Sequence, residues 1–473
     1  MIIRVVTHIF KEMISQTIFQ IFRVVNYLVY MNASFLQIII AMLAGIAVII
    51  WLTTRSKLPA FFALLIACLV TGIGVGLSLP DLITASKKGF GNTMQSLGFL
   101  IVLGTLLGLL LEQTGSTRVM ATYILKKSGE KNASLALSIT GFVVGLPVFC
   151  DSGFIVLSGL NKSMIRRTGI SAVIMSVSLA SGLYAVHCLL PPHPGAAAAA
   201  GTIGADIGKL ILFGIIIAFP VMLIGHWWAK YAGKKMEPIG TDDEEIMEED
   251  ESLPSVTRSF LPVIVPIVLI ALRSVFIDMP FASSGWMKNL LALGDPVVAL
   301  LIAVLLAITA KKHWPKNRIN KLLHDALEKA GTILLITGAG GAFGAILAST
   351  NPGDHLAALP ILSTIGIFFP FMLAFILKTA QGSSTVAIIT AASIVLPVLP
   401  VLGLDSENGR ILCVLALGAG SMVVSHANDS YFWVIAKFSG IHMKAMLRAY
   451  TVATLLMGLT AILLTWIISL FLL

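Results

Sequence analysis

Two short polar segments interrupt apolar stretches of the sequence and carry side chains that could bind a solute. The segments are GLPVFCDSGF and KTAQGSSTVA, and their candidate binding residues are Cys150, Asp151, Ser152 and Gly153, then Gln381, Gly382, Ser383, Ser384 and Thr385. A helix interrupted within a membrane exposes backbone N–H groups and a positive dipole end, both of which attract a carboxylate. Close helix packing is the alternative explanation for glycine and serine, but not for an aspartate. We therefore expect a site for a small organic anion.

Two further polar interruptions of apolar sequence follow these segments, AVHCLLPPHPGAAAAAG and SHANDSYFW. Their polar residues of interest are His187, His193, His426, Asn428 and Asp429. Ionisable side chains inside spans are costly unless they face a cavity or a partner, and histidine titrates near neutral pH. We expect His187, His426 and Asn428 at the substrate, and Asp151, Asp429 and His187 in proton coupling. A packing role is the alternative for each histidine.

Two other charged residues, Glu112 and Lys378, also fall within or beside apolar stretches. Both could take part in the site. Alternatively, Glu112 lies at the membrane interface, and the Lys378 side chain extends towards that interface.

These residues must be positioned by membrane helices. The chain is 57% hydrophobic and 12% charged, with a mean hydropathy of +0.95, which excludes a water-soluble surface. Long apolar runs without strand alternation indicate helices rather than a barrel. Candidate spans cover residues 35–52, 59–79, 97–112, 170–189, 209–228, 259–277, 295–310, 330–349, 411–436 and 449–471.

The charge distribution is that of a membrane protein, despite a net charge of +9. Eight of the 23 acidic residues lie in one run at 242–251, and the basic residues cluster in short loops. This pattern indicates positive-inside topology and the lipid bilayer as a partner, and argues against nucleic acid. The four cysteines are isolated, so we expect no disulfide framework, metal site or cofactor.

Two segments behave as hairpins rather than as single spans. Residues 131–162 carry basic clusters at both ends, so both ends are predicted to be cytoplasmic. Residues 355–402 have the flanks NPGD and DSENG, without lysine or arginine, and are predicted to enter from the other face. Opposite entry is what an inverted-topology repeat requires.

Matching motifs support this repeat. GTLLG at Gly104 corresponds to GGAFG at Gly340, the first interruption to the second, and His187 to His426. Chance similarity between apolar helices is the alternative. We expect an all-α polytopic membrane protein with two inverted-topology repeats, each with about five transmembrane helices and one re-entrant hairpin.

Four regions follow from this arrangement. Residues 1–30 are expected to be an interfacial helix or an extension upstream of a start at Met31, and the second is slightly favoured. Residues 31–228 are expected to form the first transmembrane repeat, and residues 259–473 the second. The acidic residues 229–258 are expected to form a cytoplasmic linker between them.

The segments GLPVFCDSGFIVLSGL, AVHCLLPPHPGA, ITGAGGAFGAIL, QGSSTVAIIT and SHANDSYFW resemble the gluconate permease family of proton symporters, which is similar to the wider ion transporter superfamily. The resemblance runs from about Met31 to the C-terminus. It implies uptake of gluconate or related sugar and hydroxy acids with protons, although some members carry an amino acid. The first tip in the family more often has an acidic residue followed by Val-Gly, so Asp151-Ser152-Gly153 is a departure that leaves the exact acid open.

The function expected from the sequence is secondary active, proton-coupled uptake of gluconate or a related sugar acid or small hydroxy acid in the inner membrane. One alternative is a membrane-embedded enzyme using Asp151, His187 and His193, but no HExxH, Walker loop or nucleophile elbow is present. Others are a sodium-coupled carrier of another organic or amino acid, and a channel, whose pore the hairpin tips would block. A homo-oligomer is compatible with the sequence but not required by it.

Overall fold

The computed structural model describes residues 33–129, 132–234, 253–277, 279, 285–311, 314, 316–349 and 364–473. Within these residues the chain forms helices and no strand, which confirms the predicted all-α class. The predictions for residues 1–30, for the acidic run at 242–251 and for the NPGD flank at 351–354 concern residues outside these ranges.

The helices of the first part of the chain are α2 (Ala33–Thr54), α3 (Ala60–Gly74), α4 (Leu79–Gln113), α5 (Ser116–Ser128), α6 (Ala133–Gly145), α7 (Cys150–Thr168), α8 (Ala172–Leu189), α9 (Pro194–Ile203) and α10 (Ile207–Gly233). The second part contains α11 (Val256–Phe276), α12 (Gly285–Ala292), α13 (Pro296–Thr309), α14 (Lys316–Ala348), α17 (Phe368–Gln381), α18 (Ser384–Val395), η3 (Leu396–Val398), α19 (Glu407–Met422), α20 (Ser430–Ser439), α21 (Met443–Met446), a π-helical turn η4 (Leu447–Thr451) and α22 (Val452–Leu472). Among the described residues, six helical segments are long and apolar enough to cross a bilayer.

Both predicted hairpins are broken near the expected residues. The first break lies at residues 146–149 between α6 and α7, and the second at residues 382–383 between α17 and α18. In each pair the two helices pack against one another. Cys150, Asp151, Ser152 and Gly153, expected within the first break, instead form the first turn of α7.

The span predicted over residues 411–436 is wrong as a single helix. Helix α19 ends at Met422 and α20 begins only at Ser430. The seven residues between them include His426, Asn428 and Asp429. The polar stretch SHANDSYFW lies at this interruption, and Asp429 within it caps the start of α20.

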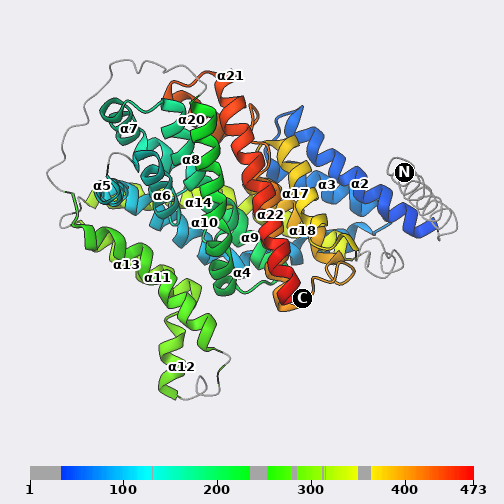
Figure 1. The fold of residues 1–473 in the computed structure, drawn as a ribbon. Helices are drawn as coiled ribbons and strands as arrows, with labels where there is room; N and C mark the ends of the chain where they lie inside the picture. Colours follow the sequence, from blue (N-terminus) through cyan, green and yellow to red (C-terminus); the bar gives the residue numbers. More distant parts are fainter. Residues whose placement is uncertain are drawn as a thin grey trace, which may run out of the picture.

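Helices α4 and α14 are much longer than the spans predicted at 97–112 and 330–349, and they pack against each other. Arg318 donates a hydrogen bond to Gln113 at 3.3 Å, and a Cβ on Gly89 would lie 2.3 Å from the carbonyl oxygen of Gly341. The C-terminal end of α4 therefore meets the N-terminal end of α14, so the two helices are antiparallel. Figure 1 shows them behind α10 and α22.

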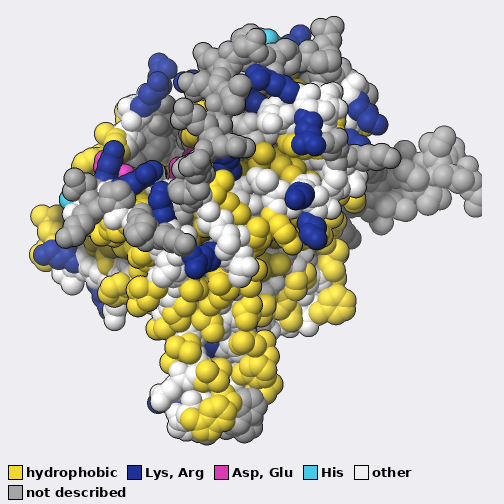
Figure 2. All heavy atoms as spheres, turned by 90° about the vertical axis from the view of Figure 1, so that its left-hand side faces the viewer, with side chains coloured by type: hydrophobic (Ala, Val, Ile, Leu, Met, Phe, Trp, Pro, Cys, Tyr) yellow, Lys and Arg dark blue, Asp and Glu magenta, His cyan; other side chains and the backbone are white. Residues whose placement is uncertain are grey.

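Helix α12 and the adjoining ends of α11 and α13 project from the body of the molecule (Figure 1), whereas other parts of α11 and α13 pack against α5 and α4. Their surface carries large exposed apolar side chains, including Leu272, Val275, Trp286 and Leu290. In Figure 2 hydrophobic side chains cover this projection, whereas lysine and arginine gather on the upper part of the face. The separation is that of a lipid-facing surface with charged residues at one margin.

Candidate functional site

A cavity of about 480 Å³ lies where four helices begin. It is lined by the first residues of α7, α9, α18 and α20, by α8, and by one side of α14. The polar and proline residues that line it from the four helix starts are Cys150, Asp151, Ser152, Pro194, Ser383, Ser384, Thr385, Asp429, Ser430 and Tyr431. Each helix N-terminus carries roughly half a positive charge. The arrangement concentrates positive potential at one place.

The structure thus brings together the two interruptions that the sequence separates by more than two hundred residues. Of the predicted site residues, eight line the cavity: Cys150, Asp151, Ser152, His187, Ser383, Ser384, Thr385 and Asp429. The other five are not among its lining residues: Gly153, Gln381, Gly382, His426 and Asn428. Gly153 packs instead against Leu183, where a Cβ would lie 2.8 Å from a leucine methyl group.

The four helix starts differ in how their free N–H groups are satisfied. Ser383 Oγ accepts from the N–H of Val386 at 3.3 Å, and Asp429 Oδ1 accepts from the N–H of Tyr431 at 3.0 Å. The N-cap residues of α7 and α9, Phe149 and His193, make no such side-chain cap within the described structure. Pro194, the first residue of α9 and its contribution to the lining, has no backbone N–H. The first-turn N–H groups of α7 are therefore the ones offered to a ligand.

Asp429 forms a buried ion pair with Lys378. Lys378 Nζ lies 2.6 Å from Asp429 Oδ2 and also donates to the carbonyl oxygen of Gly382 at 2.8 Å. Ser425 Oγ donates to the same carboxylate oxygen at 2.5 Å. Lys378 is completely buried, so the alternative that its side chain extends towards the interface is wrong. The carboxylate compensates the buried ammonium group.

Gly382 and Asn428 do not line the cavity; their contacts stabilise the second break. Asn428 Nδ2 donates to the carbonyl oxygen of Thr379 at 2.8 Å. Gly382 has a φ of 84°, and a Cβ there would lie 2.1 Å from the carbonyl oxygen of Asn428. Only glycine fits both the left-handed backbone and this close approach.

The two histidines after the first hairpin lie side by side, with ring centroids 4.9 Å apart. His193 Nε2 donates to the carbonyl oxygen of Gly145 at 2.6 Å, which ties the start of α9 to the end of α6. His187 lines the cavity and stacks on Tyr184 with an interplanar angle of 16°. His193 has a packing role, and His187 faces the cavity.

Two polar atoms of the site are buried without a hydrogen-bond partner in the part of the chain that the structure describes. They are Asp151 Oδ1 and His187 Nδ1. An unsatisfied buried polar atom costs about 1–3 kcal/mol, so a ligand or water is expected to complete these bonds.

The sequence prediction missed Lys329 and Thr332, which line the cavity from α14. They fall at the margin of the span predicted for residues 330–349, where a lysine resembles any other interfacial lysine. Helix α14 begins at Lys316, so a prediction of its full length would have placed both residues inside the helix.

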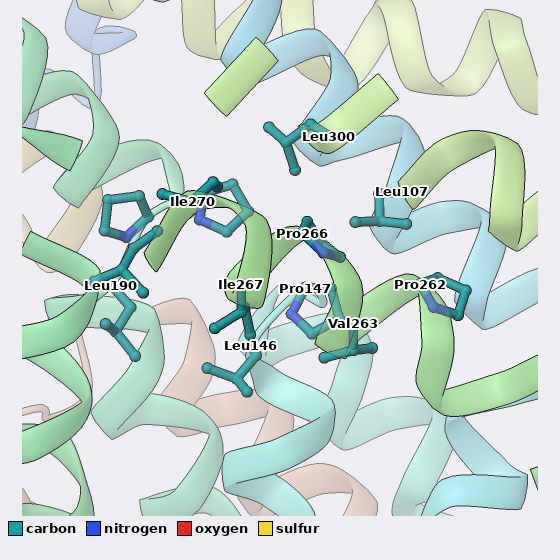
Figure 3. Close-up of a pocket in the computed structure, with 13 residues that line it drawn as sticks. Leu107, Leu146, Pro147, Leu190, Pro262, Val263, Pro266, Ile267, Ile270 and Leu300 are labelled. Atoms are coloured by element: carbon teal, nitrogen blue, oxygen red, sulfur yellow. The ribbon is translucent and has the colours of Figure 1, made fainter. Parts of the chain in front are cut away.

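The far side of the first break is sealed by apolar residues. Side chains of α11, including Val263, Pro266 and Ile267, surround Leu146 and Pro147 (Figure 3). The space left there is only about 30 Å³, barely the room of one water molecule. The polar site therefore does not extend beyond the break in this direction.

The comparisons with known proteins agree on one family of permeases. The family described as GntP family permease matches residues 36–471. An uncharacterized permease of Haemophilus influenzae is 35% identical over 436 residues, covering 88% of this chain and 89% of the relative. A gluconate permease of Pseudomonas aeruginosa is 33% identical over 438 residues, covering 89% and 95%.

The fold also resembles the crystal structure of the Alcanivorax borkumensis YdaH transporter, with a TM-score of 0.63 at 15% identity over 83% of this chain and 90% of that one. The relatives are permeases, so the alternative of a membrane-embedded enzyme is wrong. The chain is a multi-pass protein of the inner membrane. Because the family match covers nearly its whole length, the chain belongs to the GntP permease family.

Proposed function

We propose that this permease takes up gluconate, or a related sugar acid or small hydroxy acid, together with protons. The observation that carries the proposal is the meeting of four helix N-termini at one cavity, two of them without a side-chain cap. Uncapped N–H groups with a positive dipole end bind a carboxylate. The name of the Pseudomonas aeruginosa relative, a gluconate permease, supports the same class of solute.

The rest of the lining suits the hydroxyl groups of a sugar acid. Ser152, Ser384 and Thr385 offer hydroxyls, and His187 offers an unpartnered ring nitrogen. A volume of about 480 Å³ lies within the usual range of small-molecule sites, roughly 300–1,000 Å³. Lys329 supplies a cation on the opposite, α14 side. In this proposal the carboxylate lies at the uncapped start of α7, and the hydroxyls lie near α18.

The charges of the site support coupling to a proton. Asp429 is compensated by Lys378, and the lining adds Asp151 and Lys329, so the four groups sum to zero when both carboxylates are ionised. A bound monoanion would then leave an uncompensated negative charge in a partly buried place. Protonation of Asp151 removes it. We assign the coupling proton to Asp151 first, with Asp429 and His187 as further participants.

One proton per monoanion also makes the cycle electroneutral. Uptake of an uncompensated anion against an inside-negative potential is opposed by about 2.3 kcal/mol per 100 mV. The protonated carboxyl group travels with the solute and cancels this cost.

The order of the helices supports the proposed inverted repeat, with halves at 31–228 and 259–473 joined by a cytoplasmic linker at 229–258. The pairs α4 and α14, α6 and α17, α7 and α18, α8 and α19, and α9 and α20 follow in the same order in both halves. The N-caps of α9 and α20 are His193 and Asp429. We therefore pair His193 with Asp429 in the repeat, in place of His187 with His426.

Uptake by proteoliposomes tests the function. Purified protein should concentrate labelled gluconate when the outside is more acidic than the inside, and a protonophore should abolish the accumulation. Counterflow against unlabelled sugar acids, hydroxy acids and amino acids would rank the solutes. Accumulation that requires a sodium gradient and survives the protonophore would reject proton coupling, and liposomes without protein provide the background.

A further inference from the structure

A second cavity, of about 500 Å³, lies away from the helix starts. It is bounded by the N-terminal half of α4, the C-terminal half of α14 and the C-terminal end of α9. Its polar lining includes Lys88, Asn92, Thr93, Ser96, Thr202 and Ser349. Among its described lining residues, Lys88 is charged and none is acidic. Hydroxyl, amide and ammonium groups are the same chemistry that the site cavity offers a hydroxylated anion.

The two cavities share three walls. Helix α9 contributes Pro194 to the site cavity and Gly201 to the second one. Helix α14 contributes residues 329–336 to the first and 341–349 to the second. The N-terminus of α18 lines the site cavity, and Leu396, directly after its C-terminus, lines the second. The cavities therefore lie one behind the other along the same three helices.

Small buried side chains close the space between the cavities. Residues Ala196–Ala200 of α9 are at most 1% exposed. A Cβ on Gly340 of α14 would lie 2.7 Å from Ile389, and one on Gly195 would lie 2.9 Å from Ile388. Gly201 lies seven positions after Pro194 on α9, a distance of about 10 Å at 1.5 Å per residue. The barrier is thin, apolar and free of large side chains from α9.

The cavities also lie towards opposite faces of the membrane. Lys329 of the site cavity is on the side of α14 that begins in the basic cluster at 316–321, predicted to be cytoplasmic. The second cavity adjoins the end of α9, where Arg410 Nη1 donates to the carbonyl oxygen of Ile203 at 3.0 Å. Arg410 follows Ser406, in the loop predicted to be extracytoplasmic.

We propose that the second cavity is the extracytoplasmic mouth of the path along which the anion reaches the site, closed here by the alanine run of α9 against α14 and α18. Lys88 attracts the organic anion into this mouth, and Asn92, Ser96 and Ser349 replace part of its hydration. The identity of the solute rests on the proposed function, but the position of the mouth does not.

A bulky side chain in the mouth tests the path. Ser96 lines the second cavity, whereas its exposed neighbour Gln95 does not, so the two form a matched pair. Ser96→Trp should lower gluconate uptake at least tenfold, while binding of labelled gluconate to the detergent-solubilised protein changes less than twofold. Gln95→Trp should keep both near wild type. Normal uptake by Ser96→Trp would overturn the proposal.

Chemical modification tests the side of access without any solute. Ser96→Cys should react with a negatively charged, membrane-impermeant methanethiosulfonate added to right-side-out vesicles, and should react at least tenfold more slowly in inverted vesicles. The parent protein, whose four cysteines are buried, gives the background. Equal or faster reaction in inverted vesicles would overturn the proposal. A wild-type protein that binds no gluconate would defeat the proposed function and leave this result standing.

The adjacent residues Lys87 and Lys88 provide a test of the electrostatic attraction between the second cavity and the anion. Lys88→Gln should raise the KM for uptake about tenfold at low ionic strength, with little effect at high salt, because the attraction is screened. Lys87 is exposed on the same turn but does not line the cavity, so Lys87→Gln should leave the KM unchanged. Equal effects of the two variants would remove Lys88 from the path.

Discussion

The ammonium group of Lys378 lies 2.6 Å from the carboxylate of Asp429, and both groups are buried. Lys378 is in the last turn of α17 and Asp429 caps α20, so the pair joins the second hairpin to the interruption after α19. It also decides how a substitution of Asp429 must be interpreted, because the lysine would be left without a counter-charge.

We expect Asp429→Asn to destabilise the protein by about 3–5 kcal/mol, because it leaves a buried cation uncompensated. The double variant Lys378→Met, Asp429→Asn should regain much of that loss, since neither charge remains. Thermal unfolding in detergent of the wild type, both single variants and the double variant gives the coupling energy. Strictly additive losses would show that the two groups do not stabilise one another.

Asp151→Asn should abolish accumulation of gluconate while leaving exchange down its own gradient. The amide imitates the protonated carboxyl group but cannot release the proton. Wild-type uptake should rise as the external pH falls, and the variant should lose this dependence. Asp81 lies at the exposed start of α4, so Asp81→Asn is the control variant and should keep the wild-type accumulation and pH dependence. Continued accumulation by Asp151→Asn in response to an imposed pH gradient would remove Asp151 from the coupling step.

The interruptions could be predicted from the sequence because glycine, proline and polar residues stand out within apolar helices, as at Pro147 and Gly382. The partner of Asp429 could not. Lys378 is 51 positions away, and an isolated lysine near a predicted helix end has the same pattern whether it reaches the interface or a buried carboxylate.

Lys329→Gln should raise the KM for gluconate at least tenfold, because a charge-assisted hydrogen bond contributes about 1.5–3 kcal/mol. Lys329→Arg should restore part of the affinity. Lys321 is on the same helix outside the site cavity, so Lys321→Gln serves as the control in the same uptake assay. An unchanged KM in Lys329→Gln would show that Lys329 makes no hydrogen bond with the bound solute.

Gly382→Ala should be far more damaging than Gly403→Ala. Both glycines have a positive φ, 84° and 69°, which costs an alanine about 1–2 kcal/mol. At Gly403 no atom of the described residues lies within 4 Å of an added Cβ, whereas at Gly382 the backbone of Asn428 does. Melting temperatures in detergent should separate the two variants, and similar values would argue against the close approach at the second break.

The two sides of the membrane can be assigned with reporter fusions. Fusions at Glu244 and at Ser406 should report opposite compartments, with Glu244 in the cytoplasm, because basic clusters flank the spans around the linker. Activity of the same reporter at both positions would break the proposed inverted repeat.

The length of α4 was hidden from sequence reasoning for a physical reason. Hydropathy marks residues that contact lipid, and the N-terminal half of α4 carries Lys88, Asn92 and Ser96, which line the second cavity instead. Polar residues that face an internal cavity resemble a loop in a hydropathy scan. The prediction therefore began this helix at residue 97, where its apolar part starts.

The unequal capping of the four helix starts has a consequence for how the site responds to its solute. Helices α18 and α20 carry their own caps, from Ser383 and Asp429, whereas α7 and α9 begin without one. Under the proposed function, the N–H groups of α18 and α20 are capped before the solute binds, whereas the solute supplies the missing cap of α7. Amide hydrogen exchange should record this asymmetry, with binding slowing exchange at the first turn of α7 and leaving the first turns of α18 and α20 nearly unchanged.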